Sequence, residues 1–596
     1  MLLIKQQATR SVSLKESVPL KQIHVNARLR SFAADVTLTQ VFQNDESVPI
    51  EAVYCFPVEE NAAVYAFVAR IDNEREIVAE LKEKKTAQKE YTEALAQGHG
   101  AYLFEQDEAS NDIFVVSVGA YVVHLLNMLS ILVLLYYFLC RLQPGSECCI
   151  TISYVSELDL LHFDEKPTIR FVIPTTIAPR YSPAETGITS PCRTQANYVQ
   201  SAPYTIEFTC QVDKLDQHVV CISSPSHPIM VDLNNEDFFL VTFSQKTAQL
   251  DRDIIVDIEL SRARTNTIAA IEKGALMVSF MPNEEDCQRV SNNVMNEFLF
   301  VIDCSGSMED NNKIGLARKA MLLFLKSLPV KCRFNIIRFG SNFAPLFNDQ
   351  VTREYNEKNM SQAQALIQSM KADLGGTELL EPLVWLKKND PSVGFVRQVF
   401  LLTDGEVSNV DQVINLCGDM AACTRIFSFG LGHSPSRALV KGLARVTNGH
   451  YTFIPPYTNV DVHVAEQLAR ALRPSIKNLH VKWKTNQSVL HSVPKHAPPV
   501  FIHDRLLFYA ILDESMPFDH ETTVELLADM HEQPLSVARV DHVPSALTSQ
   551  TLVRLAAKTL LRELLHTSEP IAREHIVDLS LKYGILCPYT AFIGIE

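Results

Sequence analysis

The chain has 596 residues, of which 47% are hydrophobic and 21% are charged, so a wholly disordered or collagen-like protein is excluded. Its 54 lysine and arginine residues are outnumbered by 69 aspartate and glutamate residues, which gives a formal net charge of −15. Such an acidic chain disfavours nucleic acid as the main partner and suits cations better. At roughly 150 residues per domain, the length predicts about four domains.

The first residues and the cysteines indicate the compartment. Residues 1–10 contain no apolar stretch long enough for a secretory signal. The 13 cysteines include no C-x-x-C pair, no zinc-ligand spacing and no dense disulfide framework. We therefore expect a reducing environment and a cytoplasmic location.

The first part of the chain is predicted to be rich in β-strands. Residues 11–76 alternate apolar and polar side chains, which indicates antiparallel strands with one solvated face. A helix is predicted over 77–97, because this segment is rich in Glu, Lys and Ala and stops at a Gly-His-Gly sequence. Further strand patterns follow. We place one domain at 1–160 and, at 161–285, its β-rich continuation or a second β sub-unit.

An apolar run without fixed charge interrupts this pattern between Ala120 and Cys140. At ~1.5 Å per residue it is about long enough to cross a ~30 Å hydrocarbon core. When 120–141 is left out, the strand ending at Gly119 leads through a Pro-Gly turn into a second strand, so we expect a hairpin. We therefore favour an inserted segment at 120–141. A single membrane span over 120–140 and a buried helix are the alternatives.

Between residues 294 and 474, apolar runs of strand length alternate with amphipathic helices. The helices are predicted over 312–328, 361–371, 409–416, 436–445 and 461–473, and the runs are Phe298–Ile302, Phe334–Ile337, Val399–Leu402 and Arg425–Phe429. Apolar strands that alternate with helices indicate a parallel sheet covered on both faces. The expected fold is a doubly wound α/β domain.

After Pro474 the strand patterns return, and one more helix is predicted over 551–565. We expect 475–596 to form a C-terminal β-rich module with helices. The predicted fold class is therefore multidomain: a β-rich N-terminal region, an α/β domain and this C-terminal module.

Oxygen-bearing side chains follow the strands of the α/β domain, in the loops where open α/β sheets bind ligands. Asp303, Ser305 and Ser307 come after the first strand, and their spacing lets three oxygens converge on one point. Thr377 adds a hydroxyl and Asp404 adds a second carboxylate. Oxygen ligands with few carboxylates suit Mg²⁺, with Mn²⁺ as the alternative. Such an ion would keep an open position, which the carboxylate of a partner could fill.

This set of residues resembles the metal-ion-dependent adhesion site of von Willebrand factor A (VWA) domains. The resemblance implies a Rossmann-like VWA domain over 294–474 that interacts through its metal. It also implies the ligands: four residues that bind the metal directly or through water, and one that completes the shell through water, namely Asp303, Ser305, Ser307 and Thr377, and then Asp404.

The flanking regions resemble the vault protein inter-alpha-trypsin (VIT) domain. The likeness is carried by sequences such as Val53-Tyr-Cys-Phe-Pro-Val58 and Gly100-Ala-Tyr-Leu-Phe-Glu-Gln106, and it extends over nearly the whole chain. It implies a VIT-like domain at 1–160. The inter-alpha-trypsin inhibitor heavy chains share this order of domains but are secreted, whereas this chain lacks their signal peptide.

The motifs of common enzymes are absent from the sequence, which has no G-x-x-x-x-G-K-[ST], H-E-x-x-H or G-x-S-x-G. We therefore expect a non-enzymatic, intracellular protein whose Mg²⁺ site accepts an acidic residue of a protein partner. Two alternatives stay open. One is a metal-dependent hydrolase that uses the same cation as a Lewis acid, and the other is a membrane-anchored adhesion protein held by 120–140.

Overall fold

The computed structural model describes most of the chain. The described residues are 2–4, 17–18, 20–30, 32–45, 52–59, 62–72, 75–97, 99, 101–106, 113–119, 145–163, 166–174, 180–182, 187–189, 205–214, 219–244, 253–261, 267–281, 295–391, 395–404, 407, 409–421, 423–432, 435–447, 449–455, 458–472, 479–495, 497, 505–513, 522–528, 534–539, 550–565 and 571–595.

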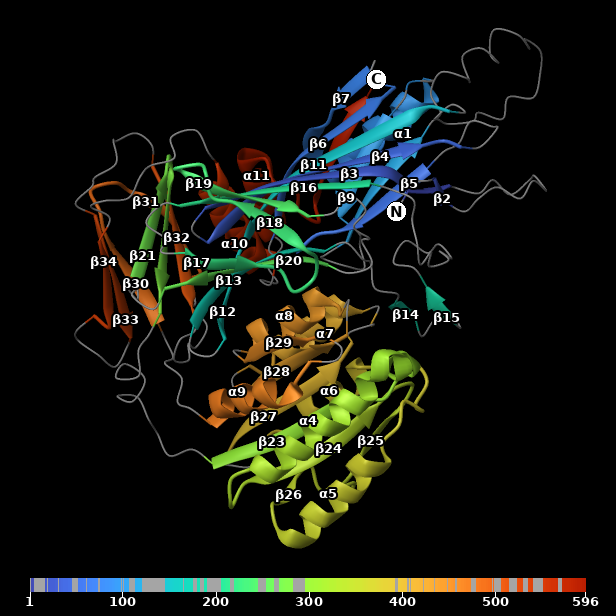
Figure 1. Ribbon diagram of the computed structural model, residues 1–596, viewed down its shortest axis with the longest axis vertical. Coiled ribbons are helices and arrows are strands. Elements are labelled where there is room, and N and C mark those ends of the chain that lie inside the picture. Colours follow the sequence, from blue (N-terminus) through green and yellow to red (C-terminus); the bar gives the residue numbers. More distant parts are fainter. Residues whose placement is uncertain are drawn as a thin grey trace, which may run out of the picture.

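Two large sheets form the β-rich region in the upper part of Figure 1. One has the strand order β2 (Ser17–Val18), β1 (Leu2–Ile4), β5 (Ala52–Pro57), β10 (Ile113–Gly119), β9 (Ala101–Gln106), β35 (Thr590–Ile595) and β8 (Glu80–Glu83). The other has the order β18 (Ile229–Asp232), β19 (Phe238–Phe243), β16 (Thr205–Asp213), β3 (Leu20–Arg30), β4 (Ala33–Gln43), β11 (Glu147–Glu157), β6 (Ala63–Ile71) and β7 (Arg75–Val78).

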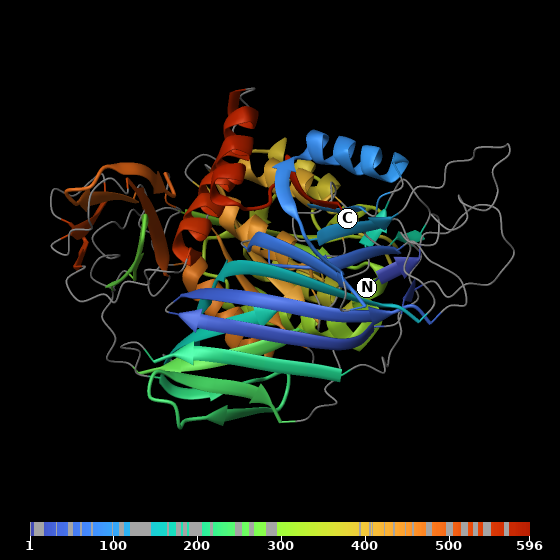
Figure 2. The ribbon, with the colours of Figure 1, turned by 90° about the horizontal axis from the view of Figure 1, so that it is seen from above.

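The alternating pattern of the N-terminal strands places their apolar side chains in a core between these sheets. In β3 every second residue is buried, namely Ile23, Val25, Ala27 and Leu29. The two sheets meet through aromatic side chains, since the rings of Phe67 in β6 and Phe104 in β9 have centroids 5.1 Å apart. Helices α10 (Thr551–Leu565) and α11 (Ile571–Tyr583) add apolar side chains to the same core. Figure 2 shows the helices of this C-terminal segment, in red, beside the sheets.

One prediction for this region is confirmed with a different start, and another is wrong. The helix predicted over 77–97 is shorter, because Glu80–Glu83 forms strand β8, which pairs with β35, and α1 spans only Lys84–Ala96. The predicted hairpin is not formed: β10 pairs with β5 and β9, while β11 pairs with β4 and β6 in the other sheet. Pairing with distant strands therefore outweighs the local turn signal.

The chain interleaves its β-rich segments on both sides of the α/β domain. Strands β21 (Thr267–Glu272) and β22 (Ala275–Phe280) form one sheet with β31 (Val489–Val493) and β32 (Leu506–Leu512). A second sheet, of β30 (Leu479–Lys484), β33 (Thr523–Ala528) and β34 (Ser536–Arg539), shares its core. The α/β domain is thus inserted between strands that pair with each other. The domain boundaries given above stay a prediction.

Two smaller sheets complete the β-rich region. One has the order β12 (Asp159–Phe163), β13 (Lys166–Ile173), β20 (Ile254–Leu260) and β17 (Val219–Ser223), and the other pairs β14 (Arg180–Ser182) with β15 (Gly187–Thr189). The sheet that contains β12 and β20 lies directly above the α/β domain in Figure 1.

The α/β domain is a doubly wound sheet, as predicted (Figure 1), and all its strands run parallel except two short ones at one edge. Its order is β25 (Phe343–Pro345), β24 (Arg333–Phe339), β23 (Met295–Asp303), β27 (Phe395–Thr403), β28 (Thr424–Leu431) and β29 (His450–Ile454), with β26 (Arg353–Glu354) also paired to β24. One face packs against α4 (Lys313–Ser327), α5 (Glu357–Ser369) and α9 (Val460–Leu472). The other packs against α6 (Leu380–Lys387), α7 (Val410–Gly418) and α8 (Arg437–Val446). Helix α6 and strand β29 were not predicted.

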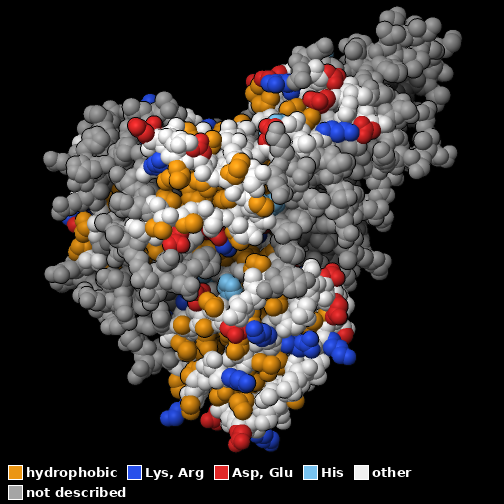
Figure 3. Space-filling view, in the orientation of Figure 1, with side chains coloured by type: hydrophobic (Ala, Val, Ile, Leu, Met, Phe, Trp, Pro, Cys, Tyr) orange, Lys and Arg blue, Asp and Glu red, His pale blue; other side chains and the backbone are white. Residues whose placement is uncertain are grey.

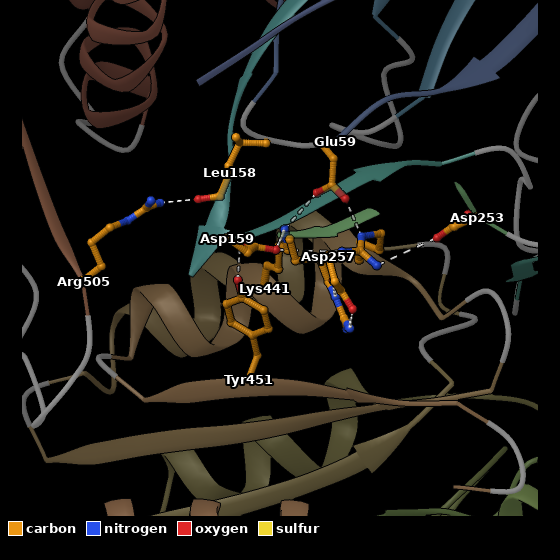
Figure 4. A network of polar contacts seen from close by, with 10 residues as sticks. Glu59, Leu158, Asp159, Asp253, Asp257, Lys441, Tyr451 and Arg505 are labelled. Carbon is orange, nitrogen blue, oxygen red and sulfur yellow. Dashed lines mark hydrogen bonds and ion pairs between the residues drawn. The ribbon is translucent and has the colours of Figure 1, made fainter. Parts of the chain in front are cut away.

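A buried ionic network joins α8 and β29 to the β-rich region (Figure 4). The Lys441 ammonium lies 3.0 Å from Glu59 Oε2 and 2.9 Å from Asp159 Oδ2. The Tyr451 hydroxyl donates a hydrogen bond of 2.8 Å to Asp159 Oδ1. Arg437 pairs with Glu59 and lies 3.8 Å from Asp253. These contacts fix the α/β domain against the loops of the β-rich region.

The segment 120–141, predicted as an insertion or a membrane span, lies outside the described residues. In the part of the chain that is described, no helix is both long and apolar enough to cross a membrane.

Candidate metal centre

The two acidic residues of the predicted site follow neighbouring parallel strands. Asp303 is the last residue of β23, and Asp404 comes directly after β27. The two strands pair in parallel, with Ile302 opposite Leu402, so their carboxyl ends reach the same edge of the sheet. This edge is where open α/β sheets bind ligands.

The carboxylate of Asp303 is fully buried and held on both oxygens. Oδ1 accepts a hydrogen bond of 2.9 Å from the backbone N–H of Ser305, and Oδ2 accepts one of 2.6 Å from the Thr403 hydroxyl. Thr403 was not among the predicted site residues. Its position at the end of β27, one residue before Asp404, is the signal that could have identified it.

The two serines and the threonine lie on loops that the backbone ties together. The Ser305 and Ser307 hydroxyls are 3.1 Å apart and hydrogen-bond to each other. Between them, Gly306 N–H donates a hydrogen bond of 2.8 Å to the Gly375 carbonyl, which brings the loop of Thr377 against this turn. Thr377 itself is 5% exposed.

Gly375 allows this loop to approach so closely. Its φ of +79° lies in the left-handed region, and a Cβ at this position would lie 2.8 Å from Ser341 Oγ. That hydroxyl instead accepts a hydrogen bond of 2.8 Å from Gly376 N–H. Ser341, which follows β24, is therefore a further residue that shapes the site without having been predicted.

A lysine that the sequence reasoning missed lies beside Asp404. The Lys313 Nζ donates to Asp404 Oδ2 at 2.9 Å and to the Ser307 carbonyl oxygen at 3.1 Å. Both partners of this ion pair are buried, with side chains 10% and 3% exposed. The carbonyl oxygen of Asp404 also accepts a hydrogen bond of 3.1 Å from Ser436 N–H, just before α8.

Asp303 and Asp404 form a pair of neighbouring buried carboxylates. Burial, and after it the nearby Asp404 carboxylate, raises the pKa of Asp303 to about 7. Two neighbouring buried carboxylates are unfavourable when both are ionised, unless positive charge compensates them. Lys313 supplies one such charge, and a bound cation would supply more.

The residues present fit a small, hard cation. No group of three or more His, Cys, Asp or Glu side chains that could hold a metal occurs among the described residues. A cation at this edge would therefore need hydroxyl ligands besides the Asp303 and Asp404 carboxylates. Ser305, Ser307 and Thr377 carry such hydroxyls on the loops described above, and oxygen donors suit Mg²⁺. Metal binding by these five residues stays a prediction.

Comparisons with known proteins confirm both predicted domain types. Residues 20–121 match the vault protein inter-alpha-trypsin domain, and residues 296–453 match the von Willebrand factor type A domain. The chain is 33% identical to von Willebrand factor A domain-containing protein 5A of Mus musculus, over 98% of this chain and 74% of that protein. It is 32% identical to the Homo sapiens protein of the same name, over the same shares.

Among solved structures, a von Willebrand factor type A protein from Catenulispora acidiphila matches with a TM-score of 0.35 and 14% sequence identity. That match covers 53% of this chain and 84% of the other.

Proposed function

The chain belongs to the von Willebrand factor A domain-containing protein 5A family of VIT- and VWA-domain proteins, and from this premise we propose that it binds a protein partner through Mg²⁺. The cation would be held by Asp303, Ser305, Ser307, Thr377 and Asp404, and Mn²⁺ would be able to replace it. The bound cation would take a carboxylate oxygen of the partner as a further ligand.

The observation that carries the proposal is the incompletely compensated pair of carboxylates at the edge of the sheet. Asp303 is fully buried, Asp404 is 2% exposed, and the Asp404 carboxylate raises the pKa of Asp303. A divalent cation would relieve this repulsion. Two carboxylates and three hydroxyls fill fewer than the six ligand positions of an octahedral Mg²⁺. An acidic side chain of a partner can therefore supply a further ligand.

We propose binding rather than catalysis, because the sequence carries none of the common hydrolase motifs. Generic phosphoesters are therefore expected to remain intact when the protein is supplied with Mg²⁺. Turnover that Asp303→Asn abolishes would support the hydrolase alternative instead.

The experiment that tests the function compares partner capture by two baits. The full chain and its Asp303→Asn variant are used to capture proteins in Mg²⁺ and in EDTA, and the retained proteins are identified by mass spectrometry. We expect at least one protein to be retained only by the wild-type chain in Mg²⁺, and to lose binding when an acidic residue in its binding segment is replaced by the amide.

The matched control is Asp390→Asn, because Asp390 is an exposed aspartate of the same domain. This variant should capture the same proteins as the wild-type chain. Identical retention by Asp303→Asn, or by the wild-type chain in EDTA, would contradict the mechanism.

We further propose a cytoplasmic location without a membrane anchor, and alkaline carbonate extraction tests whether the chain is anchored in a membrane. A protein without a membrane span is expected in the supernatant. Retention in the membrane pellet would support the alternative of a protein anchored by 120–140.

A further inference from the structure

A lysine is buried at the edge of the sheet where the cation is proposed to bind. Lys313 is 8% exposed, and its ammonium lies 2.9 Å from Asp404 Oδ2 and 3.1 Å from the Ser307 carbonyl oxygen. It is also the first residue of α4, where the helix dipole disfavours a cation. The helix therefore does not stabilise the positive charge of Lys313. Its contacts with Asp404 and the Ser307 carbonyl do stabilise it.

The backbone around the lysine leaves room for its side chain. Gly432 follows β28 and has a φ of +105°, in the left-handed region. A Cβ at this position would lie 2.9 Å from Lys313 Cε. A larger residue at position 432 would therefore displace the Lys313 side chain. The glycine thus helps to keep the ammonium beside Asp404.

We propose that Lys313 is the internal counter-cation of the metal site, a positioning residue that holds Asp404 and offsets one of the two carboxylate charges. This inference rests on the proposed function, because it concerns a cation bound beside Asp303 and Asp404. Lys313 contributes no oxygen ligand. Its role is to set the charge that an incoming cation meets and the orientation of Asp404.

The charge balance shows what such a residue does. Taken by themselves, the Asp303 and Asp404 carboxylates and the Lys313 ammonium carry one net negative charge, so a divalent cation would bring these groups to a net charge of plus one. An occupied positive site attracts a carboxylate from a partner. Without Lys313 the site would bind the cation more tightly but would be neutral once occupied. Lys313 therefore lowers the affinity of the site for the metal but strengthens the attraction of the occupied site for an acidic partner.

The test is the affinity of the purified full chain for Mn²⁺ alone, measured by electron paramagnetic resonance of the free ion. Lys313→Met keeps much of the side-chain length and removes the charge. We expect it to bind Mn²⁺ about tenfold more tightly, since loss of one unit charge in a mostly buried site corresponds to at least this change.

The control is Lys319→Met, on the same helix. The Lys319 side chain is 55% exposed, and Figure 3 shows Lys and Arg side chains at the surface of the α/β domain around α4. Its removal should leave the Mn²⁺ affinity unchanged. If Lys313→Met does not fold, Lys313→Gln serves instead, because it is uncharged and still offers a hydrogen-bond donor.

The direction of the change separates this role from a purely structural one, since damage to the site would weaken Mn²⁺ binding. Unchanged or weaker binding by both Lys313 variants, beside a wild-type chain that binds Mn²⁺, would overturn the counter-cation role alone. A wild-type chain that binds no Mn²⁺ would overturn the proposed function as well.

Discussion

Two clusters of buried charge contact the start of α8, and they are balanced differently. In the ionic network at the domain junction each of four carboxylates forms an ion pair with a cationic side chain: Glu59, Asp159 and Asp253 with Arg437 or Lys441, and Asp257 with Arg170 (Figure 4). At the candidate metal centre, Lys313 pairs with Asp404, whereas Asp303 accepts hydrogen bonds from the Ser305 N–H and the Thr403 hydroxyl.

This contrast separates a structural cluster of charges from a functional one. At the junction each of the four carboxylates has a cationic partner, so these charges are stabilised without any ligand. At the edge of the α/β sheet the positive charge falls short, and the shortage lies where such sheets bind ligands. Two adjacent residues contact the two clusters. Ser436 N–H donates to the Asp404 carbonyl, and Arg437 pairs with Glu59.

The largest effect is expected from breaking the balance at the junction. Lys441→Met should lower the free energy of unfolding by about 3–5 kcal/mol, because it leaves Glu59 and Asp159 buried with less positive charge beside them. Urea denaturation followed by tryptophan fluorescence and circular dichroism measures this. An unchanged midpoint would show that the network does not stabilise the junction.

A smaller, pH-dependent effect is expected from Asp159. Burial would raise the pKa of this carboxyl, but Lys441 and then Arg437 lower it from 3.8 to about 2. Because the folded pKa lies below the unfolded one, the stabilisation by ionised Asp159 is present above about pH 4 and is lost as the pH falls towards 2.

Asp159→Asn removes this contribution of about 2 kcal/mol. Urea midpoints of the wild-type chain and the variant should therefore differ most near neutral pH and converge in acid. A gap that stays constant down to pH 2 would contradict the assignment of the pKa shift to this residue.

The smallest effect is expected from an exposed ion pair of the same domain. Lys387 and Asp419 are 2.6 Å apart, but their side chains are 42% and 62% exposed. Lys387→Met should change the free energy of unfolding by no more than about 1 kcal/mol. A loss as large as that of Lys441→Met would show that burial is not what makes the junction network strong.

The α/β domain could be predicted from the sequence because its signals are local. Apolar strands such as Phe298–Ile302 are buried on both faces, and helices such as α8 begin and end within a residue of the predicted limits. The placement of Asp303 and Asp404 at one edge follows from the same pattern, since both come directly after parallel strands.

The missed features depend on contacts between distant segments. Nothing in the sequence near residue 590 shows that β35 pairs with β8 and β9, and that pairing is what turns Glu80–Glu83 into a strand. The junction network joins residues as far apart as Glu59 and Lys441, with no spacing that a motif could capture. Lys313 did leave a signal, because a lysine in the first turn of a helix opposes the helix dipole.

The most direct test of the metal centre is the binding of Mn²⁺ to the purified full chain, followed by electron paramagnetic resonance and by competition with Mg²⁺. One Mn²⁺ per chain is expected, displaced by Mg²⁺, absent in Asp303→Asn and retained in the control Asp390→Asn. A wild-type chain that binds no Mn²⁺, or an Asp303→Asn variant that binds it equally well, would contradict the account.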